Sequence, residues 1–362
     1  MKEAAYNDTM ALYEKFGKLE KEIQMQQETR LILPENYDAK LNIRQTEEAI
    51  KLIKDRFERE LAAALNLHRI SAPLFVRPDS GLNDNLNGVE RPVQFDLKDT
   101  GEQVEIIHSL AKWKRMALRR YGYGVDEGIY TDMNAIRRDE EMDNLHSIYV
   151  DQWDWELTIS RQERSQEFLR DLVGRIYEAL RRTENAVMEK YPCLERYVPE
   201  ELHFITTQEL EDRYPALSPK EREDAITKEL GAVFLMQIGG ALKSGKKHDG
   251  RAPDYDDWSL NGDILVYYPV LGRAFEVSSM GIRVDEEAMR RQLELAGCPE
   301  RAQLRFHQEL LEGKLPLTAG GGIGQSRLCM LLLGKAHIGE VQASIWPRQM
   351  RERCEQEGIW LL

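Results

Sequence analysis

Residues 318–333 read TAGGGIGQSRLCMLLL, a glycine-rich segment followed by an arginine and an apolar run. Four glycines within five positions let the backbone approach a ligand closely, because no side chain lies between them. We therefore predict a glycine turn that leads into a buried helix, with Arg327 near the start of that helix. The alternative is a helix that needs only a tight turn at its start.

Two common phosphate-binding motifs do not fit this segment. The loop of nucleotide hydrolases requires Lys followed by Ser or Thr after its last glycine, whereas Gln325-Ser326-Arg327 stands here. A dinucleotide-binding fingerprint needs a glycine where Arg327 stands. The open backbone and the fixed cation are better suited to a flat anionic ligand such as a nucleotide.

Composition and length bound the class of protein. The chain has 362 residues, enough for one large domain or two modest ones with a sizeable core. Its 42% hydrophobic and 31% charged residues are typical of a soluble globular protein. No apolar run approaches the roughly 20 residues that cross a membrane, and residues 1–3 open a polar segment without a signal-peptide core. We expect a cytoplasmic protein without a membrane partner.

Cysteine spacing and net charge argue against several further classes of protein. The four cysteines are scattered without close pairing, which argues against a zinc site or a disulfide framework. A net charge of -13 would repel a polyanion. Nucleic acid is therefore not expected as a main partner.

The first part of the chain differs from the rest. Residues 1–32 are charged and helix-prone, with Met10, Leu12, Phe16 and Leu19 at helical spacing. We predict a helical extension that forms a surface helix or a frayed arm, with a partner-binding helix as the alternative. A single domain is expected to span residues 33–362.

Residues 45–66 carry a strong helical pattern, because apolar side chains recur at three- and four-residue steps. The segment that follows has the composition of a short strand and includes Pro73. Proline cannot donate to a central ladder, so an edge or interface strand is predicted.

The remaining periodicity mixes helices and strands. Amphipathic helices are predicted over residues 165–190 and 218–230, the second opened by a capping box at Ser218. Strands are predicted at 93–97, 104–107 and 231–240. The predicted fold class is α+β, with an antiparallel sheet flanked by helices.

A basic helix start follows the strand at 104–107. Ser109 is placed to cap this helix, and Lys112, Lys114 and Arg115 crowd its first turns. Cations at a helix start oppose the helix dipole. A bound anion explains them better than local stability does.

Residues 135–140 and 146–156 are predicted to form two strands joined by a short polar loop. Two-residue alternation puts Gln152 and Asp154 on the same face as Ile148 and Val150. Polar and apolar groups on one face indicate a wet cavity, and the alternative is a solvated edge strand.

A hairpin is predicted from residue 262 to residue 284. It carries Asp263 and Glu276 in otherwise apolar strands, where a buried unpaired carboxylate costs several kcal/mol, roughly. A hard divalent cation would remove that cost. Magnesium held by one or two carboxylates, with substrate phosphates completing its shell, is the expected form.

Several segments together resemble a known family. The helix and strand ending at Pro73, residues 137–146 and residues 320–327 look like the three motifs of the class II aminoacyl-tRNA synthetase catalytic core, in their order. More narrowly, four segments resemble the ammonia-dependent asparagine synthetases: residues 108–115, 149–156, 251–258 and 320–327. The resemblance runs from about Leu33 to the C-terminus, and it implies that residues 33–362 form one catalytic domain.

The resemblance implies an activity. Such enzymes join L-aspartate and ammonia to give L-asparagine through a β-aspartyl-adenylate, with ATP cleaved to AMP and pyrophosphate. ATP and Mg²⁺ are then expected as co-substrate and cofactor, L-aspartate and ammonium as substrates, and a homodimer paired through the segment ending at Pro73. Residue 2 is Lys2 and not the cysteine of glutamine-dependent synthetases, so free ammonia is the expected nitrogen donor.

The family also implies roles for particular residues. Arg137 is expected at the α-phosphate and Arg327 at the nucleotide. The further expected roles are Lys114 and Ser109 at a substrate carboxylate, Gln152 and Asp154 at the amino end of aspartate, Ser279 in substrate binding, His146 in nucleotide binding, and Glu276 with Asp256 or Asp263 at nucleotide-bound magnesium.

Asp84 lies in the segment Asn83-Asp84-Asn85-Leu86-Asn87-Gly88, whose composition is typical of a turn. One interpretation is therefore that Asp84 only stabilises this turn. The family resemblance favours a catalytic role. Ammonium must lose a proton before it attacks, and a carboxylate beside the acyl carbon could hold the cation and accept that proton.

Two other functions remain open from the sequence. One is a regulatory relative that binds aspartate or adenylate without turnover, although the retained cations and carboxylates argue against it. The other is a minimal aspartyl- or asparaginyl-tRNA synthetase, which charge and size disfavour.

Overall fold

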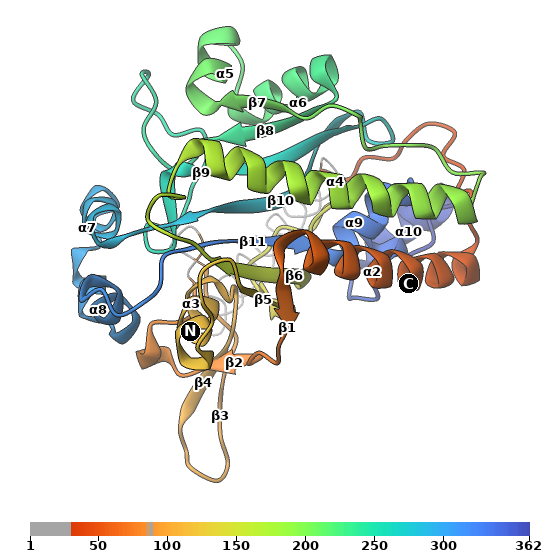
Figure 1. Cartoon of the computed structure of the whole chain (residues 1–362). Coiled ribbons are helices and arrows are strands. Elements are labelled where there is room, and N and C mark those ends of the chain that lie inside the picture. Colours follow the sequence, from red (N-terminus) through yellow and green to blue (C-terminus); the bar gives the residue numbers. More distant parts are fainter. Residues whose placement is uncertain (1–29, 85, 87–89) are drawn as a thin grey trace, which may run out of the picture.

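The computed structural model describes residues 30–84, 86 and 90–362. The predicted extension of residues 1–32 therefore lies almost wholly outside the described residues. An eight-stranded mixed sheet forms the centre of the molecule (Figure 1). In spatial order its strands are β1 (Leu67–Arg69), β5 (Gly128–Ile136), β6 (Tyr149–Thr158), β11 (Thr318–Gly324), β10 (Arg273–Arg283), β9 (Asp256–Tyr268), β8 (Ala232–Met236) and β7 (His203–Thr206).

Most neighbouring strands pair antiparallel, as predicted, but the two outermost pairs are parallel. These pairs are β1 with β5 and β7 with β8. Each outer strand is short and is followed or preceded by a helix, so a crossover connection is available for parallel pairing. The strand that precedes Pro73 lies at an edge of the sheet, as expected.

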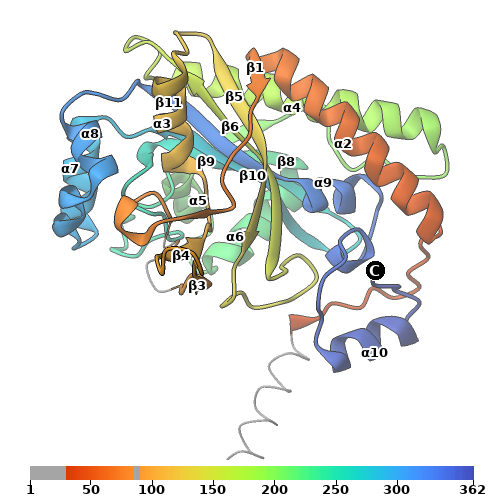
Figure 2. The ribbon, with the colours of Figure 1, turned by 90° about the horizontal axis from the view of Figure 1, so that it is seen from below.

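Two long helices lie side by side across one face of the sheet (Figures 1 and 2). They are α2 (Ile43–Leu65) and α4 (Gln166–Lys190). The odd-numbered side chains Trp153 and Trp155 of β6 point to this face, and Trp153 stacks on Phe57 of α2 with ring centroids 4.8 Å apart. Alternation sends the even-numbered side chains of β6 to the opposite face.

The opposite face carries α3 (Ala111–Tyr121) near β6, and α6 (Pro219–Leu230) near β9 and β10. The helix α5 (Thr207–Arg213) precedes β8. The helices α7 (Glu286–Leu295) and α8 (Arg305–Leu311) form a small separate core beyond β10 (Figure 1). The C-terminal part contains α9 (Gln325–Leu332) and α10 (Arg348–Gln356).

A second, three-stranded sheet projects from the body as an arm (Figure 1). Its order is β2 (Phe75–Val76), β4 (Gln103–Ile106) and β3 (Gln94–Asp96). The two strands predicted at 93–97 and 104–107 therefore form this arm. Within the described part of the chain, no helix has the length and apolar character needed to cross a membrane.

Three local predictions differ from the structure. The strand predicted at residues 135–140 is the end of β5, which stops at Ile136, so residues 137–140 belong to the loop that follows. Residues 318–324 form a strand paired on both sides and not a turn, and the buried helix α9 follows it directly. The N-cap of α3 is Leu110 and not Ser109. The Ser109 hydroxyl still accepts a hydrogen bond from the backbone N–H of Ala111 at 3.1 Å, so it satisfies one of the free donors of this helix.

Candidate active site

A cavity of about 430 Å³ opens on the face of the sheet that carries α3 and α6. Its floor is formed by β6, β10 and β11, and its walls come from the loops that follow β5 and precede β9. Ten of the predicted site residues line it: Asp84, Ser109, Arg137, His146, Gln152, Asp154, Asp256, Glu276, Ser279 and Arg327. The structure therefore brings these predicted residues together, while Lys114 and Asp263 lie just behind the lining.

The glycines of β11 make room for polar side chains of the neighbouring strands. A Cβ on Gly320 would overlap the carboxylate of Glu156 and the guanidinium of Arg283. A Cβ on Gly322 would overlap the amide of Gln152. Glycine is needed here for close approach within the sheet, since none of these glycines has a positive φ.

Two arginines present positive charge to the cavity. Arg137 follows β5 and makes only a long contact with Glu140, at 3.9 Å, and its buried Nε has no hydrogen-bond partner in the part of the chain that is described. Arg327 lies in the first turn of α9, where its Nη1 donates to the carbonyl of Glu276 at 3.3 Å. Guanidinium groups with free donors are suited to phosphate.

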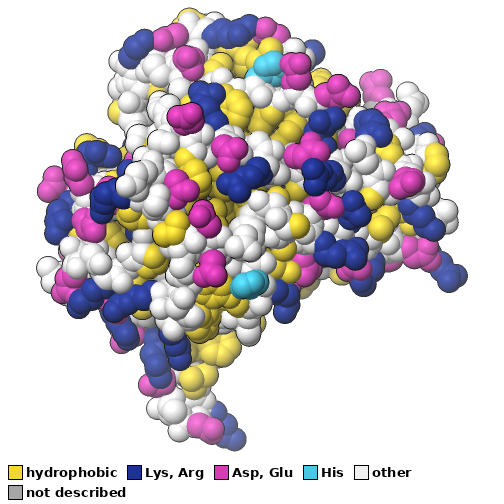
Figure 3. Space-filling model, viewed as in Figure 1, with side chains coloured by type: hydrophobic (Ala, Val, Ile, Leu, Met, Phe, Trp, Pro, Cys, Tyr) yellow, Lys and Arg dark blue, Asp and Glu magenta, His cyan; other side chains and the backbone are white. Residues whose placement is uncertain are grey.

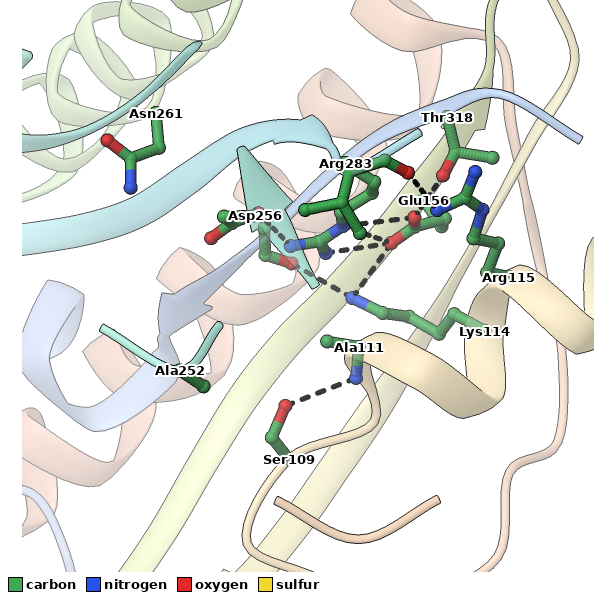
Figure 4. A network of polar contacts seen from close by, with 12 residues as sticks. Ser109, Ala111, Lys114, Arg115, Glu156, Ala252, Asp256, Asn261, Arg283 and Thr318 are labelled. Atoms are coloured by element: carbon green, nitrogen blue, oxygen red, sulfur yellow. Dashed lines mark hydrogen bonds and ion pairs between the residues drawn. The ribbon is translucent and has the colours of Figure 1, made fainter. Parts of the chain in front are cut away.

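Lys114 is fully buried. Its ammonium group is already bound by other groups of the protein (Figure 4). Its ammonium donates to Asp154 Oδ1 at 2.5 Å, to the carbonyl of Trp155 at 2.8 Å and to the carbonyl of Gly321 at 3.2 Å. Lys114 thus joins α3 to β6 and β11 and holds the Asp154 carboxylate at the cavity wall.

Beside Lys114 lies a buried ion-pair network that the sequence reasoning did not identify as part of the site (Figure 4). Arg283 donates from Nε and Nη2 to Glu156, at 3.0 and 2.8 Å, and from Nη1 to Asp256 at 2.5 Å. The hydroxyl of Thr318 donates to Glu156 at 2.7 Å. One feature of the sequence could have indicated this network: Arg283 stands at the end of the same apolar strand that carries Glu276. A buried cation requires a partner of opposite charge.

The predicted magnesium ligands differ in whether they have a carboxylate oxygen left to bind a metal ion. Asp256 is bound to Arg283, whereas Asp263 pairs with Arg251 through Oδ2 and has a buried Oδ1 without a hydrogen-bond partner among the described residues. Burial raises the pKa of Asp263, and the nearby negative charge of Glu276 adds to this effect.

Glu276 has the opposite shift. Burial opposes its ionisation, but Arg327 and Arg251 more than offset that effect, and its pKa is lowered. An ionised carboxylate near an unpartnered buried carboxylate oxygen fits a hard cation. No group of three or more potential metal-ligating side chains occurs in the described ranges, so phosphate oxygens would have to complete the coordination shell.

Asp84 reaches the cavity from the segment that connects β2 to β3 of the arm. Only 2% of it is exposed; Oδ1 accepts from the N–H of Leu86 at 2.9 Å, and no described residue bonds Oδ2. The ring Nδ1 of His108 bonds the Asp84 carbonyl at 2.9 Å. Burial raises the pKa of Asp84, and the charge of Lys112 opposes this shift.

The loop after β5 is fixed through Asn144 to the start of the described chain and to the segment that follows α9. The Asn144 side chain bonds the N–H and the carbonyl of Ile32 at 2.7 and 2.8 Å, and the carbonyl of Ala336 at 2.8 Å. His146 follows in the same loop, with Nδ1 at 2.8 Å from Asp143. The loop that carries Arg137 and His146 is therefore held by two segments that are distant in sequence.

The family model for aspartate-ammonia ligase matches residues 44–358 of the chain. A protein of Ruminiclostridium cellulolyticum named aspartate–ammonia ligase is 65% identical over 333 residues, covering 92% of this chain and 99% of that protein. Proteins of the same name from Clostridium tetani and Levilactobacillus brevis are 65% and 60% identical, each over 92% of this chain and over 98% and 99% of their own lengths.

Solved structures show the same fold at low identity. Asparaginyl-tRNA synthetase from Entamoeba histolytica, in complex with asparaginyl-adenylate, has a TM-score of 0.60 at 14% identity, covering 83% of this chain and 66% of that one. The enzyme from Pyrococcus horikoshii has a TM-score of 0.60 at 16% identity, covering 84% and 70%. The predicted class II synthetase-like fold is thereby confirmed, and the chain belongs to the aspartate–ammonia ligase family.

Proposed function

We propose that this chain joins L-aspartate and ammonia to give L-asparagine, with ATP cleaved to AMP and pyrophosphate, as a step of amino-acid biosynthesis. The observation that carries the proposal is a single cavity that gathers Arg137, Arg327, Asp154, Glu276 and Asp84. These groups supply phosphate binding, recognition of an amino group, a metal-binding carboxylate and a base. The family membership supports the same reaction.

The first half-reaction forms β-aspartyl-adenylate. The β-carboxylate attacks the α-phosphorus, the bond to the β-phosphate breaks, and pyrophosphate leaves with the electron pair. Arg137 binds the α-phosphate and Arg327 the nucleotide, with His146 near the phosphates at the mouth of the cavity. Phosphoryl transfer requires mainly positioning and positive charge, and these residues provide both.

Mg²⁺ is proposed as the metal of the nucleotide. Glu276 and Asp263 would hold it, because Arg327 and Arg251 lower the pKa of Glu276 and the nearby Oδ1 of Asp263 has no partner in the hydrogen-bond geometry of the described residues. When bound, the ion neutralises charge on the phosphates. Asp256 instead fixes Arg283, so we assign it a part in the nucleotide site through that arginine.

L-Aspartate is proposed to bind along β6. The Asp154 carboxylate and the Gln152 amide oxygen receive its ammonium group, and Arg283 faces its α-carboxylate, assisted by the hydroxyls of Ser109 and Ser279. Lys114, which the sequence placed at a substrate carboxylate, instead holds Asp154 from behind the cavity lining. This orientation directs the β-carboxylate to the phosphate subsite. Opposite charges at the two ends of one small ligand explain why carboxylates and cations alternate on this wall.

The second half-reaction transfers nitrogen. Ammonium binds at Asp84, the carboxylate accepts one proton, and the nitrogen lone pair attacks the acyl carbon. The nitrogen loses a second proton to solvent, the bond between the acyl carbon and the phosphate oxygen breaks, and AMP leaves with that electron pair. Oδ2 of Asp84 has no hydrogen-bond partner among residues 30–84, 86 and 90–362, and a buried oxygen of this kind can bind a cationic ligand, which supports this role.

We also propose that residues 33–362 act as one catalytic domain in a cytoplasmic homodimer. Hydrophobic side chains are visible where the arm joins the body (Figure 3), and Leu74, Phe75 and Phe95 are 49%, 42% and 38% exposed. Leu74 and Phe75 follow a few residues after β1, the strand expected at the interface. Sedimentation that finds only monomers at micromolar concentration would contradict the dimer.

The test of the activity uses purified protein with ATP, magnesium and aspartate, and either ammonium or tRNA. Ammonium-dependent release of asparagine, AMP and pyrophosphate in equal amounts is expected. Aspartyl transfer to tRNA, or nucleotide binding without turnover, would refute the proposal.

A further inference from the structure

Lys220, in the first turn of α6, lines the same cavity as Arg137, Arg327 and Glu276. Its side chain is 61% exposed although it makes an ion pair, so a ligand in the cavity can reach the ammonium. No family motif in the sequence includes this lysine. Its position in the cavity therefore calls for a function.

A hydrogen bond between α6 and β10 places Lys220 relative to Glu276. The carboxylate Oδ1 of Asp224 on α6 accepts from the backbone N–H of Ala274 on β10 at 2.8 Å. Lys220 precedes Asp224 by about one helical turn, roughly 6 Å, on the same face of α6. Glu276 follows Ala274 by two residues, about 7 Å along the strand. Lys220 and Glu276 both line the cavity, so these two steps run in the same direction and the lysine lies at the Glu276 end.

The electrostatics agree with this placement. Burial opposes the ionisation of Glu276, but its pKa is lowered by four neighbouring cationic or imidazole side chains, namely Arg327, Arg251, Lys220 and His146. All four line the cavity. Positively charged donors therefore gather around the carboxylate that is proposed to hold magnesium.

Glu223, about one turn after Lys220, orients the lysine. Lys220 Nζ lies 3.0 Å from Oε2 and 3.4 Å from Oε1 of Glu223, which is only 6% exposed. Nε2 of the buried His248 lies 2.9 Å from the same Oε1. An ammonium has three N–H donors, so at least one is left for a ligand after both oxygens of Glu223 are bound.

We propose that Lys220, oriented by Glu223, binds the β- and γ-phosphates of ATP and the pyrophosphate that leaves. The inference rests on the function proposed above. Arg137 is assigned to the α-phosphate, whereas the metal-binding Glu276 marks the end of the cavity that receives the other two phosphates. A lysine ammonium is a compact charge that is well suited to phosphate oxygens.

This role belongs to the first half-reaction alone. As the bond from the α-phosphorus to the bridging oxygen breaks, pyrophosphate takes the electron pair. The ammonium of Lys220 stabilises the added negative charge and keeps its own protons. The adenylate retains only the α-phosphate, so Lys220 has no ligand during nitrogen transfer.

The experiment measures aspartate-dependent exchange of labelled pyrophosphate into ATP by Lys220→Met. Loss of one charge-assisted hydrogen bond should raise the Michaelis constants for pyrophosphate and ATP by about 10-fold to 100-fold. AMP release from the isolated complex of enzyme and aspartyl-adenylate, mixed with ammonium chloride, should keep the wild-type rate. A general structural defect would slow both steps.

Two further variants serve as controls. Lys228→Met removes an exposed lysine from the same helix and should leave both steps unchanged. The double variant that combines Lys220→Met with Glu223→Gln removes one charge of each sign, so it tests whether the effect of Lys220→Met comes only from an unpaired Glu223. The Michaelis constant for pyrophosphate should stay raised in this double variant, because the phosphate ligand is still missing.

An unchanged Michaelis constant for pyrophosphate in Lys220→Met, or its return to the wild-type value in the double variant, would overturn the inference. An equal loss of exchange and of AMP release would do the same. A wild-type protein that shows no aspartate-dependent exchange would instead refute the proposed function.

Discussion

Glu156→Gln tests whether the buried ion-pair network supports the site. Glu156 is fully buried and accepts hydrogen bonds from Arg283 at 2.8, 3.0 and 3.2 Å and from Thr318 at 2.7 Å, and the ammonium of Lys114 lies 3.7 Å away. Glutamine has nearly the same shape but no charge. It would leave two buried cations with less compensation and would direct an NH₂ group at one of them.

Removal of one partner from a buried ion pair costs about 3–5 kcal/mol. We expect the free energy of unfolding in urea to fall by about that amount, which is a large part of the roughly 5–15 kcal/mol of a typical protein. The Michaelis constant for aspartate should rise as well, because Arg283 loses its anchor at the cavity.

The matched control is Glu352→Gln on α10. Glu352 pairs with Arg348 at 2.7 Å, but the side chains are 51% and 90% exposed. An exposed pair contributes at most about 1 kcal/mol. If Glu156→Gln lost no more stability than Glu352→Gln, the argument that this network is desolvated and structurally required would be wrong.

Three further substitutions test separate parts of the molecule. Lys114→Ala should slow aspartate-dependent pyrophosphate exchange by about 10²-fold or more, because Asp154 and the aspartate site lose their fixed cation, and near-normal exchange would contradict this. Asp84→Asn should spare exchange but slow amide formation, whereas an equal loss of both steps would show the role assigned to Asp84 to be wrong. Burial lowers the pKa of His337 from 6.5 to about 4. Between these two pH values the His337 imidazole is protonated in the unfolded chain but not in the folded chain, so the free energy of unfolding falls as the pH drops from 6.5 to 4. His337→Gln should flatten the loss of unfolding free energy over that range by up to about 3 kcal/mol; an unchanged slope in urea titrations would count against this.

Helix and strand periodicity predicted much of the scaffold. The long helices α2 and α4 carry unbroken apolar stripes, and the hairpin of β9 and β10 has a clear turn, so their limits lie within a few residues of those expected. The glycine segment was assigned wrongly to a turn. Its glycines serve the side chains of neighbouring strands, a long-range requirement that no local pattern expresses.

The sequence predicted which residues belong to the candidate site better than it predicted the contacts between them. The family motifs supplied Arg137, Glu276 and Arg327, and the fold places these side chains at one cavity. The engagement of Lys114 by Asp154, and of Asp256 by Arg283, depends on which strands become neighbours. That information is absent from the spacing of residues along the chain.

The hydrogen bonds of Asn144 couple the loop that carries Arg137 and His146 to Ile32 and to Ala336. Its amide is satisfied only while Ile32 and Ala336 remain in place. A shortened protein that begins between residues 26 and 30 retains the backbone groups of Ile32, whereas a deletion past Ile32 leaves a buried amide half unpaired. Removal of residues up to Ile32 is therefore expected to loosen the loop that carries Arg137 and His146, although it changes none of the residues that line the cavity.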